Sequence, residues 1–190
     1  MSYHLSLMRQ ALLLNYIRLT PSRFQSKEWR KKQDWYINGK KNECETFQKK
    51  MIQEITKTSL EHTSYRLNLN TLELKSVMNP FLFKNGLEWS ENFDGYQEIN
   101  SDILFYNLKF VCDQGGAQYR TLRSTYQFIH CQYRFSARKN VYFFNILDGD
   151  AFYRARDKFD FLSDKYENGQ NVFVGDLFEF QTHWDQFFSR

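Results

Sequence analysis

The chain has 190 residues, enough for one domain with a substantial core, and 18% of them are aromatic. Only 2 prolines and 8 glycines occur, which argues against long disordered linkers. The net charge is +4, but residues 1–80 hold 14 Lys and Arg against 7 Asp and Glu, whereas residues 81–190 hold 12 against 15. A basic half beside an acidic half suits a protein that grips a polyanion, and it also suits ordinary solvated helix faces.

Cysteine usage and hydropathy limit the class of protein further. Cys44, Cys112 and Cys131 are odd in number and form no CxxC motif, which argues against a disulfide framework and a zinc site and favours a reducing compartment. The longest apolar run near the N-terminus, residues 11–14, is too short for a signal peptide or a membrane span. We therefore expect a soluble, intracellular protein of the cytoplasm that does not enter a membrane.

The first half of the chain is predicted to be helical. Apolar spacing predicts helices at residues 3–19, 27–37 and 43–57. Pro21 and the turn at residues 38–42 separate them. Residues 58–85 show no clear pattern, and Asn79 before a proline marks a boundary. These observations predict an N-terminal helical subdomain over residues 1–80.

The second half, residues 81–190, alternates strand and helix patterns. Strands are predicted at residues 87–93, 101–113, 140–150 and 171–180, and helices at residues 116–135, 151–166 and 183–188. The strand at 140–150 is almost entirely apolar and is therefore expected at the centre of the sheet, covered on both faces. The order predicts an α/β fold with a mixed central β-sheet flanked by helices.

Two polar side chains interrupt the apolar strand at 101–113. Side chains alternate along a strand, so Asn107 and Lys109 are expected to project from the same face. A lysine in such a strand needs a partner, since lysine is rarely buried unpaired. Either it forms a local ion pair, with Asp102 or Asp113 in an unrelated α/β domain, or it is a catalytic cation beside carboxylates.

The preceding strand supplies those carboxylates. Asp94 stands where this strand is expected to enter a turn at Gly95, and Glu91 lies three residues earlier. An acid at a strand end next to a lysine on the neighbouring strand suits a metal-dependent phosphodiesterase. In this interpretation Asp94 holds Mg²⁺, or Mn²⁺, and Lys109 stabilises the negative charge that develops in the transition state.

The arrangement resembles a known family. An acid followed after a spacer by (D/E)-x-Lys, within an α-β-β-α-β order, is the pattern of PD-(D/E)XK nucleases. The segment "NLKFVCDQGGAQYRTLRSTYQFI" is similar to the "E-x-(K/N)-F … GG(S/A)…R…Y" segment of GATC-type type II restriction endonucleases. The resemblance covers residues 87–180 and implies a restriction-endonuclease-like core.

Residue by residue, the resemblance assigns Asp94 to the first acid, Asn107 to the second acid and Lys109 to the lysine. An amide oxygen ligates Mg²⁺ without adding charge, so Glu91 or Asp113 is a candidate additional ligand. The resemblance implies an endonuclease that cuts double-stranded DNA as a homodimer, because cutting both strands at a short site usually uses two active sites. The alternative is a nuclease-fold protein that has lost an acid and only binds nucleic acid or another partner.

Two helices are candidate DNA contacts. The helix at 116–135 follows a Gly-Gly turn, and free N–H groups at a helix start favour an anion. Its predicted core face holds Tyr119, Leu122, Tyr126, Ile129 and Tyr133, and a neighbouring stripe holds Arg120, Arg123, Gln127, His130 and Arg134. Gln118, Arg120 and Arg123 are the predicted phosphate contacts, unless the stripe is simply solvated. The basic helix at 27–37 either lies along DNA or anchors its tryptophans in the core.

Two further acids end the strand at 140–150. Asp148 and Asp150 flank Gly149 and are expected to form a turn with it rather than to bind a metal.

Overall fold

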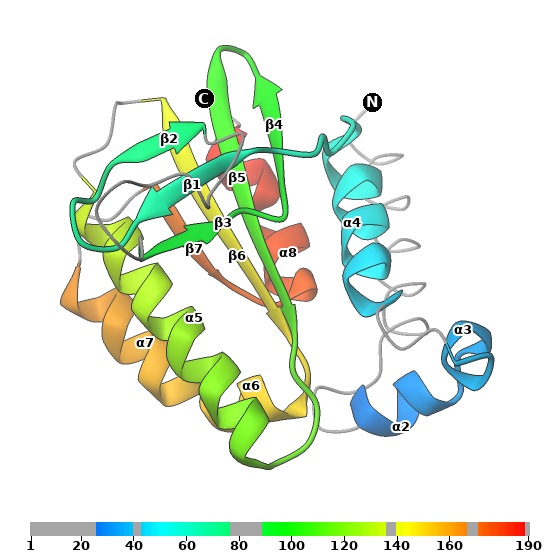
Figure 1. Cartoon of the computed structure of the whole chain (residues 1–190). Coiled ribbons are helices and arrows are strands. Elements are labelled where there is room, and N and C mark those ends of the chain that lie inside the picture. Colours follow the sequence, from blue (N-terminus) through cyan, green and yellow to red (C-terminus); the bar gives the residue numbers. More distant parts are fainter. Residues whose placement is uncertain (1–25, 40–42, 77–88, 136–139, 167–170, 189–190) are drawn as a thin grey trace.

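The computed structural model describes residues 26–39, 43–76, 89–135, 140–166 and 171–188. Within these residues the chain is a mixed α/β structure with two sheets flanked by helices (Figure 1). The helices are α2 (Ser26–Lys31), α3 (Asp34–Ile37), α4 (Glu43–Thr56), α5 (Gly116–Arg134), α6 (Asp150–Arg154), α7 (Arg156–Lys165) and α8 (Leu177–Phe188). The strands are β1 (Tyr65–Asn68), β2 (Leu74–Ser76), β3 (Ser90–Asn92), β4 (Gly95–Ile99), β5 (Asp102–Phe110), β6 (Val141–Asp148) and β7 (Val172–Gly175).

The larger sheet has four strands in the order β4-β5-β6-β7. β4 is antiparallel to β5, from Gly95 opposite Tyr106 to Ile99 opposite Asp102. β5, β6 and β7 are parallel, so helical connections cross the sheet between them. β6 lies inside the sheet and is buried along almost its whole length, which confirms the prediction from its apolar sequence. The predicted mixed sheet flanked by helices is therefore correct.

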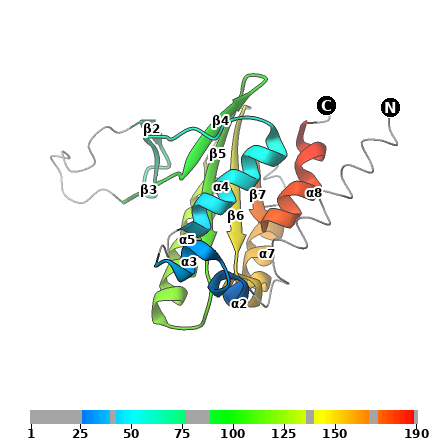
Figure 2. The same ribbon diagram turned by 90° about the vertical axis from the view of Figure 1, so that its right-hand side faces the viewer.

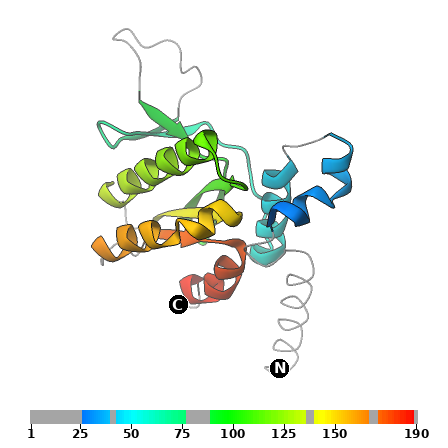
Figure 3. The ribbon, with the colours of Figure 1, turned by 90° about the horizontal axis from the view of Figure 1, so that it is seen from below.

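Helices cover both faces of this sheet (Figures 2 and 3). Leu104, Tyr106 and Leu108 of β5 pack with Ile52 of α4 and Phe180 of α8. The opposite face is covered by α5, α6 and α7 through a cluster that includes Leu122, Ile129, Leu147, Phe152 and Phe159. Burying each such side chain stabilises the fold by about 1.5–3 kcal/mol. The alternation along β5 thus divides the core into two layers.

The smaller sheet, β2-β1-β3, packs on the α5 side of the larger one. Leu67 of β1 lies in a cluster with Phe93, Phe105 and Phe143. The ring centroids of Phe93 and Phe105 are 4.8 Å apart. β1 and β2 lie in the region without a clear sequence pattern, because three- and four-residue strands are too short to show one.

The strand predicted at residues 87–93 is β3, but it belongs to the smaller sheet, and β4 is the partner of β5. The turn expected at Gly95 is wrong. The chain turns instead at Asn100 and Ser101, whose φ angles of 51° and 74° suit a tight hairpin. Gly95 is needed for close packing, since a Cβ there would lie 2.8 Å from Cγ of Leu60.

Described residues of the N-terminal half contact this core. The predicted helix at 3–19 and the boundary near residue 80 lie outside the described residues. The helix predicted at 43–57 is confirmed as α4, and it packs on the larger sheet. The helix predicted at 27–37 is interrupted between α2 and α3. Trp29 of α2 stacks on Phe110 with ring centroids 5.8 Å apart, so it anchors α2 to the end of β5.

The C-terminal elements differ from the prediction in their boundaries. The strand predicted at 171–180 ends at Gly175, and α8 starts at Leu177. Asp176 Oδ1 accepts a hydrogen bond of 2.8 Å from Glu179 N, and Glu179 Oε2 accepts one of 2.9 Å from Asp176 N. This reciprocal capping box starts a helix where apolar alternation suggested a strand. The helix predicted at 151–166 is divided into α6 and α7 around Ala155.

None of the helices in the described ranges combines the length and apolar character that a bilayer span requires. Cys44, Cys112 and Cys131 are buried free thiols. Burial raises the pKa of the Cys44 and Cys112 thiols to about 11, which keeps both protonated at neutral pH.

Candidate functional site

Asp94 and Lys109 meet at the carboxyl end of β5. Asp94 precedes β4 and stands beside the last residues of β5, because β4 runs antiparallel to it. Lys109 Nζ lies 3.3 Å from Asp94 Oδ2 and donates a hydrogen bond of 2.9 Å to the carbonyl of Leu108. The side chains of Lys109 and Asp94 are 31% and 23% exposed, so the pair is accessible from solvent. The lysine pairs with Asp94 rather than with Asp102 or Asp113.

The position of the Asp94 side chain follows from where the pairing of β4 with β5 ends. β4 pairs with β5 only as far as Tyr106, and the chain before it leaves for the smaller sheet. The Asp94 carboxylate replaces the missing strand carbonyl, since Oδ2 accepts a hydrogen bond of 2.7 Å from Leu108 N. One oxygen of Asp94 is thereby fixed, while Oδ1 accepts no hydrogen bond from any residue in the described ranges.

Glu45 of α4 is the residue that the sequence analysis missed. Desolvation by the surrounding protein raises the pKa of its carboxyl, the negative charge of Asp94 raises it further, and Lys109 lowers it. Gln48, one turn later, donates a hydrogen bond of 3.1 Å to the Lys109 carbonyl and so holds α4 against the end of β5. Glu45, an exposed residue, thus lies within electrostatic reach of Asp94 and Lys109, and the three are here called the charged group. No local sequence pattern marks it, because α4 reaches β5 only in the tertiary structure.

Asn107 lies elsewhere, in a buried amide network. It is 2% exposed, and its Nδ2 donates a hydrogen bond of 2.9 Å to Asn145 Oδ1. Asn145 in turn donates to Gln132 Oε1 at 2.7 Å and to the Phe173 carbonyl at 3.1 Å. The structure therefore does not bring Asn107 into the Asp94–Lys109 pair, although Asn107 and Lys109 both lie on β5. Parallel register places Asn107 directly opposite Asn145, and the two amides satisfy each other.

Glu91 is also separate from the pair. It is exposed on β3, where it stands opposite Leu67 in the smaller sheet. Within the described ranges, no three acidic, histidine or cysteine side chains come together in a group able to hold a metal ion.

The predicted phosphate contacts lie on the first turns of α5. Arg120 and Arg123 are exposed, and Gln118 is half-buried. The predicted core face is wrong at Tyr119, whose side chain is 64% exposed. The buried face is formed by Leu122, Thr125, Phe128, Ile129, Cys131 and Gln132. The first turns of α5 extend past the strand ends (Figure 1), so Tyr119 has no sheet to pack against.

Buried acids lie at the carboxyl ends of the next two strands. Asp148 Oδ2 accepts a hydrogen bond of 2.7 Å from Gln48, and Oδ1 accepts one of 3.3 Å from Leu177 N. Burial first, and then the charge of Asp176, raise the pKa of Asp148 to about 7. The turn predicted at Gly149 is present, with a φ of 106°. Asp148 therefore joins α4 and α8 to the end of β6.

Comparisons of the chain with family models, with curated proteins and with solved structures give no match.

Proposed function

We propose that the chain is a metal-dependent endonuclease that hydrolyses phosphodiester bonds of double-stranded DNA, with a restriction-endonuclease-like core. The observation that carries the proposal is the Asp94–Lys109 pair, 3.3 Å apart at the carboxyl end of β5, with Glu45 within electrostatic reach of both. Carboxyl ends of parallel strands are the usual place for ligand sites in α/β sheets.

The two carboxylates fit a divalent cation. Desolvation first, and then the negative charge of Asp94, raise the pKa of Glu45, and a cation between the two carboxylates would relieve their repulsion. Oδ1 of Asp94 remains available to a ligand, because the hydrogen bonds from Leu108 and Lys109 both go to Oδ2. Mg²⁺ is commonly held by only one or two carboxylates together with substrate phosphates and water, so a third protein ligand is not required. In this proposal Glu45 replaces Asn107 and Glu91 as the second ligand.

Each residue of the group has a separate role. Bound Mg²⁺ or Mn²⁺ would polarise the scissile phosphate and lower the pKa of water. Lys109 stabilises the charge that develops on the phosphate oxygens in the transition state. Asp94 also holds the ammonium of Lys109 at the sheet edge. Arg120 and Arg123 of α5 bind neighbouring phosphates, and a homodimer supplies a second site for the second strand.

A second function has its own supporting observation. Asn107, which the resemblance assigns to the second acid position, is held in the buried amide network and does not join the Asp94–Lys109 pair. A protein of this kind would bind nucleic acid without cutting it.

Incubation of supercoiled plasmid with the purified protein and Mg²⁺ or Mn²⁺ tests the proposal. Asp94→Asn, Lys109→Met and Glu45→Gln are each expected to reduce cleavage by about 100-fold or more. Asp94→Asn keeps an oxygen that accepts from Leu108 N, so its fold should persist. Glu54→Gln, an exposed glutamate on the same helix as Glu45, is the matched control and should cut as the wild type does.

The outcomes separate the two functions. Cleavage that survives Asp94→Asn and Lys109→Met would refute this active site. Salt-sensitive DNA binding without cleavage by the wild type would favour the binding function instead. If the wild type neither cuts nor binds DNA, both proposed functions are wrong.

A further inference from the structure

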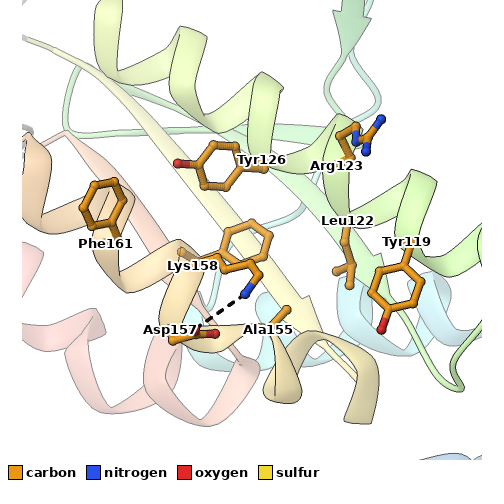
Figure 4. A pocket seen from close by; sticks show the side chains of 9 residues that line it. Tyr119, Leu122, Arg123, Tyr126, Ala155, Asp157, Lys158 and Phe161 are labelled. Carbon is orange, nitrogen blue, oxygen red and sulfur yellow. Dashed lines mark ion pairs between the residues drawn. The ribbon is translucent and has the colours of Figure 1, made fainter.

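A pocket lies between α5 and α7, away from the charged group at the end of β5. Its volume is about 640 Å³. α5 contributes Tyr119, Leu122 and Tyr126, and α7 contributes Phe159 and Phe161. In Figure 4, Tyr119 and Leu122 point from α5 toward the α6–α7 junction, and the ammonium of Lys158 lies between the two helices. Aromatic rings from both helices therefore line the pocket, together with the exposed pair of Lys158 and Asp157.

Two of these rings are exposed to solvent. Tyr119 is 64% exposed and Phe161 is 65% exposed. Phe159, by contrast, is buried, and its ring packs against Tyr126 with centroids 5.8 Å apart. Buried Phe159 and half-buried Tyr126 form the floor, while the exposed rings stand at the rim, where a flat ligand can stack on them.

A smaller pocket of about 120 Å³ continues the first one toward the β5–α5 turn. The two share four lining residues: Tyr119, Leu122, Ala155 and Lys158. The smaller pocket is the polar part, with Gln118, Arg154 and Asp113 in its wall. The two pockets together, here called the α5–α7 slot, have an apolar body and a polar end.

The charges of the slot favour an anion at this polar end. Among the residues that the structure describes, Lys158 pairs only with Asp157, at 3.5 Å, and both side chains are at least 69% exposed, so the pair is weak. Arg154 is 45% exposed while it pairs with Asp150. The one acid in the smaller pocket, Asp113, is already compensated by Lys27 and Arg30. The first turn of α5 also opens here, and its N-cap Gly115 supplies no side-chain hydrogen bond.

We propose that the α5–α7 slot binds a nucleotide, with the base against Tyr119, Tyr126 and Phe161 and the phosphate at Lys158 and Arg154. Every base offers a flat face that stacks on aromatic rings, and cations and helix N-termini receive phosphate. The volume lies within the range of about 300–1,000 Å³ typical of small-ligand sites. The nucleotide is either free or an unpaired nucleotide of a DNA strand. Arg123, a proposed phosphate contact of the nuclease, also lines the slot, but Asp94 and Lys109 do not, so the inference stands without the proposed cleavage activity.

Isothermal titration calorimetry tests this with dAMP, deoxyadenosine, inorganic phosphate and a short single-stranded oligonucleotide. We expect dAMP or the oligonucleotide to bind. If dAMP binds, deoxyadenosine alone and phosphate alone should each bind at least about tenfold more weakly than dAMP. Binding of the oligonucleotide alone would identify the DNA strand as the source, and binding of dAMP would identify the free nucleotide. No heat from either at millimolar concentration would overturn the inference.

Variants then locate the bound nucleotide. Phe161→Ala should weaken its binding by about tenfold, since one stacked base contributes a comparable factor. Lys158→Ala should weaken binding of dAMP or oligonucleotide but not of deoxyadenosine. Ile37→Ala, an equally exposed apolar residue on α3, is the control and should change nothing. Binding that survives both slot variants would overturn the inference.

A further outcome concerns a second copy of the chain. The wild type could form dimers that Phe161→Ala converts to monomers, while neither dAMP nor the oligonucleotide binds. That result would show that another protomer fills the slot, and the inference would be wrong. Binding of nucleotide by Asp94→Asn at wild-type affinity is expected, and it separates this slot from the proposed active site.

Discussion

Replacing Asp148 by asparagine is expected to change how the stability of the protein depends on pH. The carboxyl is buried at the end of β6, where it accepts hydrogen bonds from Gln48 and from Leu177 N. The negative charge of Asp176 lies close to it, and Glu179 adds a weaker effect of the same sign. Gln48 Oε1 is buried without a hydrogen-bond partner in the described part of the chain, so it is available to accept a proton donor. Burial first, and then the charge of Asp176, favour the neutral form of Asp148 and outweigh the two hydrogen bonds, which favour its charged form.

The size of the effect follows from the shift in pKa. The ordinary value for aspartate is 3.8, and the pKa of Asp148 rises to about 7. The folded state therefore binds the proton more tightly, and this stabilisation is complete below the ordinary pKa and lost as the pH rises through about 7. Each pH unit within that window changes the free energy of unfolding by about 1.4 kcal/mol. From about pH 5 to about pH 8 the loss is about 3 kcal/mol.

Urea unfolding followed by circular dichroism at both pH values measures this loss. Asparagine does not titrate, so the stability of Asp148→Asn relative to the wild type should rise by about 3 kcal/mol between about pH 5 and about pH 8. Asp157→Asn is the control, because the side chain of Asp157 is 75% exposed, and it should follow the wild type. If Asp148→Asn also followed the wild type at both pH values, Asp148 would not carry the proton and the reasoning would be wrong.

Three further predictions concern packing and backbone. Asn145→Ala should lower the free energy of unfolding by about 2–4 kcal/mol, since it leaves two buried amides without their partner, and urea unfolding measures this. Gly149→Ala should destabilise by at least about 2 kcal/mol in the same assay, because φ is 106° and a Cβ would lie 2.2 Å from the Val111 carbonyl oxygen. Gly116→Ala, which meets nothing within 4 Å, should stay within about 0.5 kcal/mol of the wild type, and a larger loss would contradict this account.

Much of the fold was predictable because local periodicity reports which side of an element is buried. α4, α5, β5 and β6 follow from apolar spacing alone, and their predicted ranges agree with the structure within a few residues. Periodicity failed where another local interaction decided the outcome. The capping box of Asp176 and Glu179 starts α8 within an apolar segment that was predicted to be a strand. The hairpin at Asn100 and Ser101 places β4 directly after Asp94, where a turn at Gly95 was predicted.

The candidate site was predictable only in part, for a related reason. An acid before one strand and a lysine on the next suggested that Asp94 and Lys109 lie together, and they are 3.3 Å apart. Asn107 was expected beside them because it shares a strand face with Lys109. Its partner Asn145 is 38 residues away in sequence, and only the parallel register of β5 and β6 reveals the pairing.

The sequence by itself determined the alternation of β5, the helical stripe of α5 and the uneven distribution of charge. The tertiary structure decided which of the polar residues share a site. It brought Glu45 of α4 to the end of β5, withdrew Asn107 into the core and left Tyr119 and Phe161 facing one slot. The physical reason is that the spacing of residues within one element fixes the direction of a side chain, whereas its neighbours come from elements that reach it only when the sheet and helices pack.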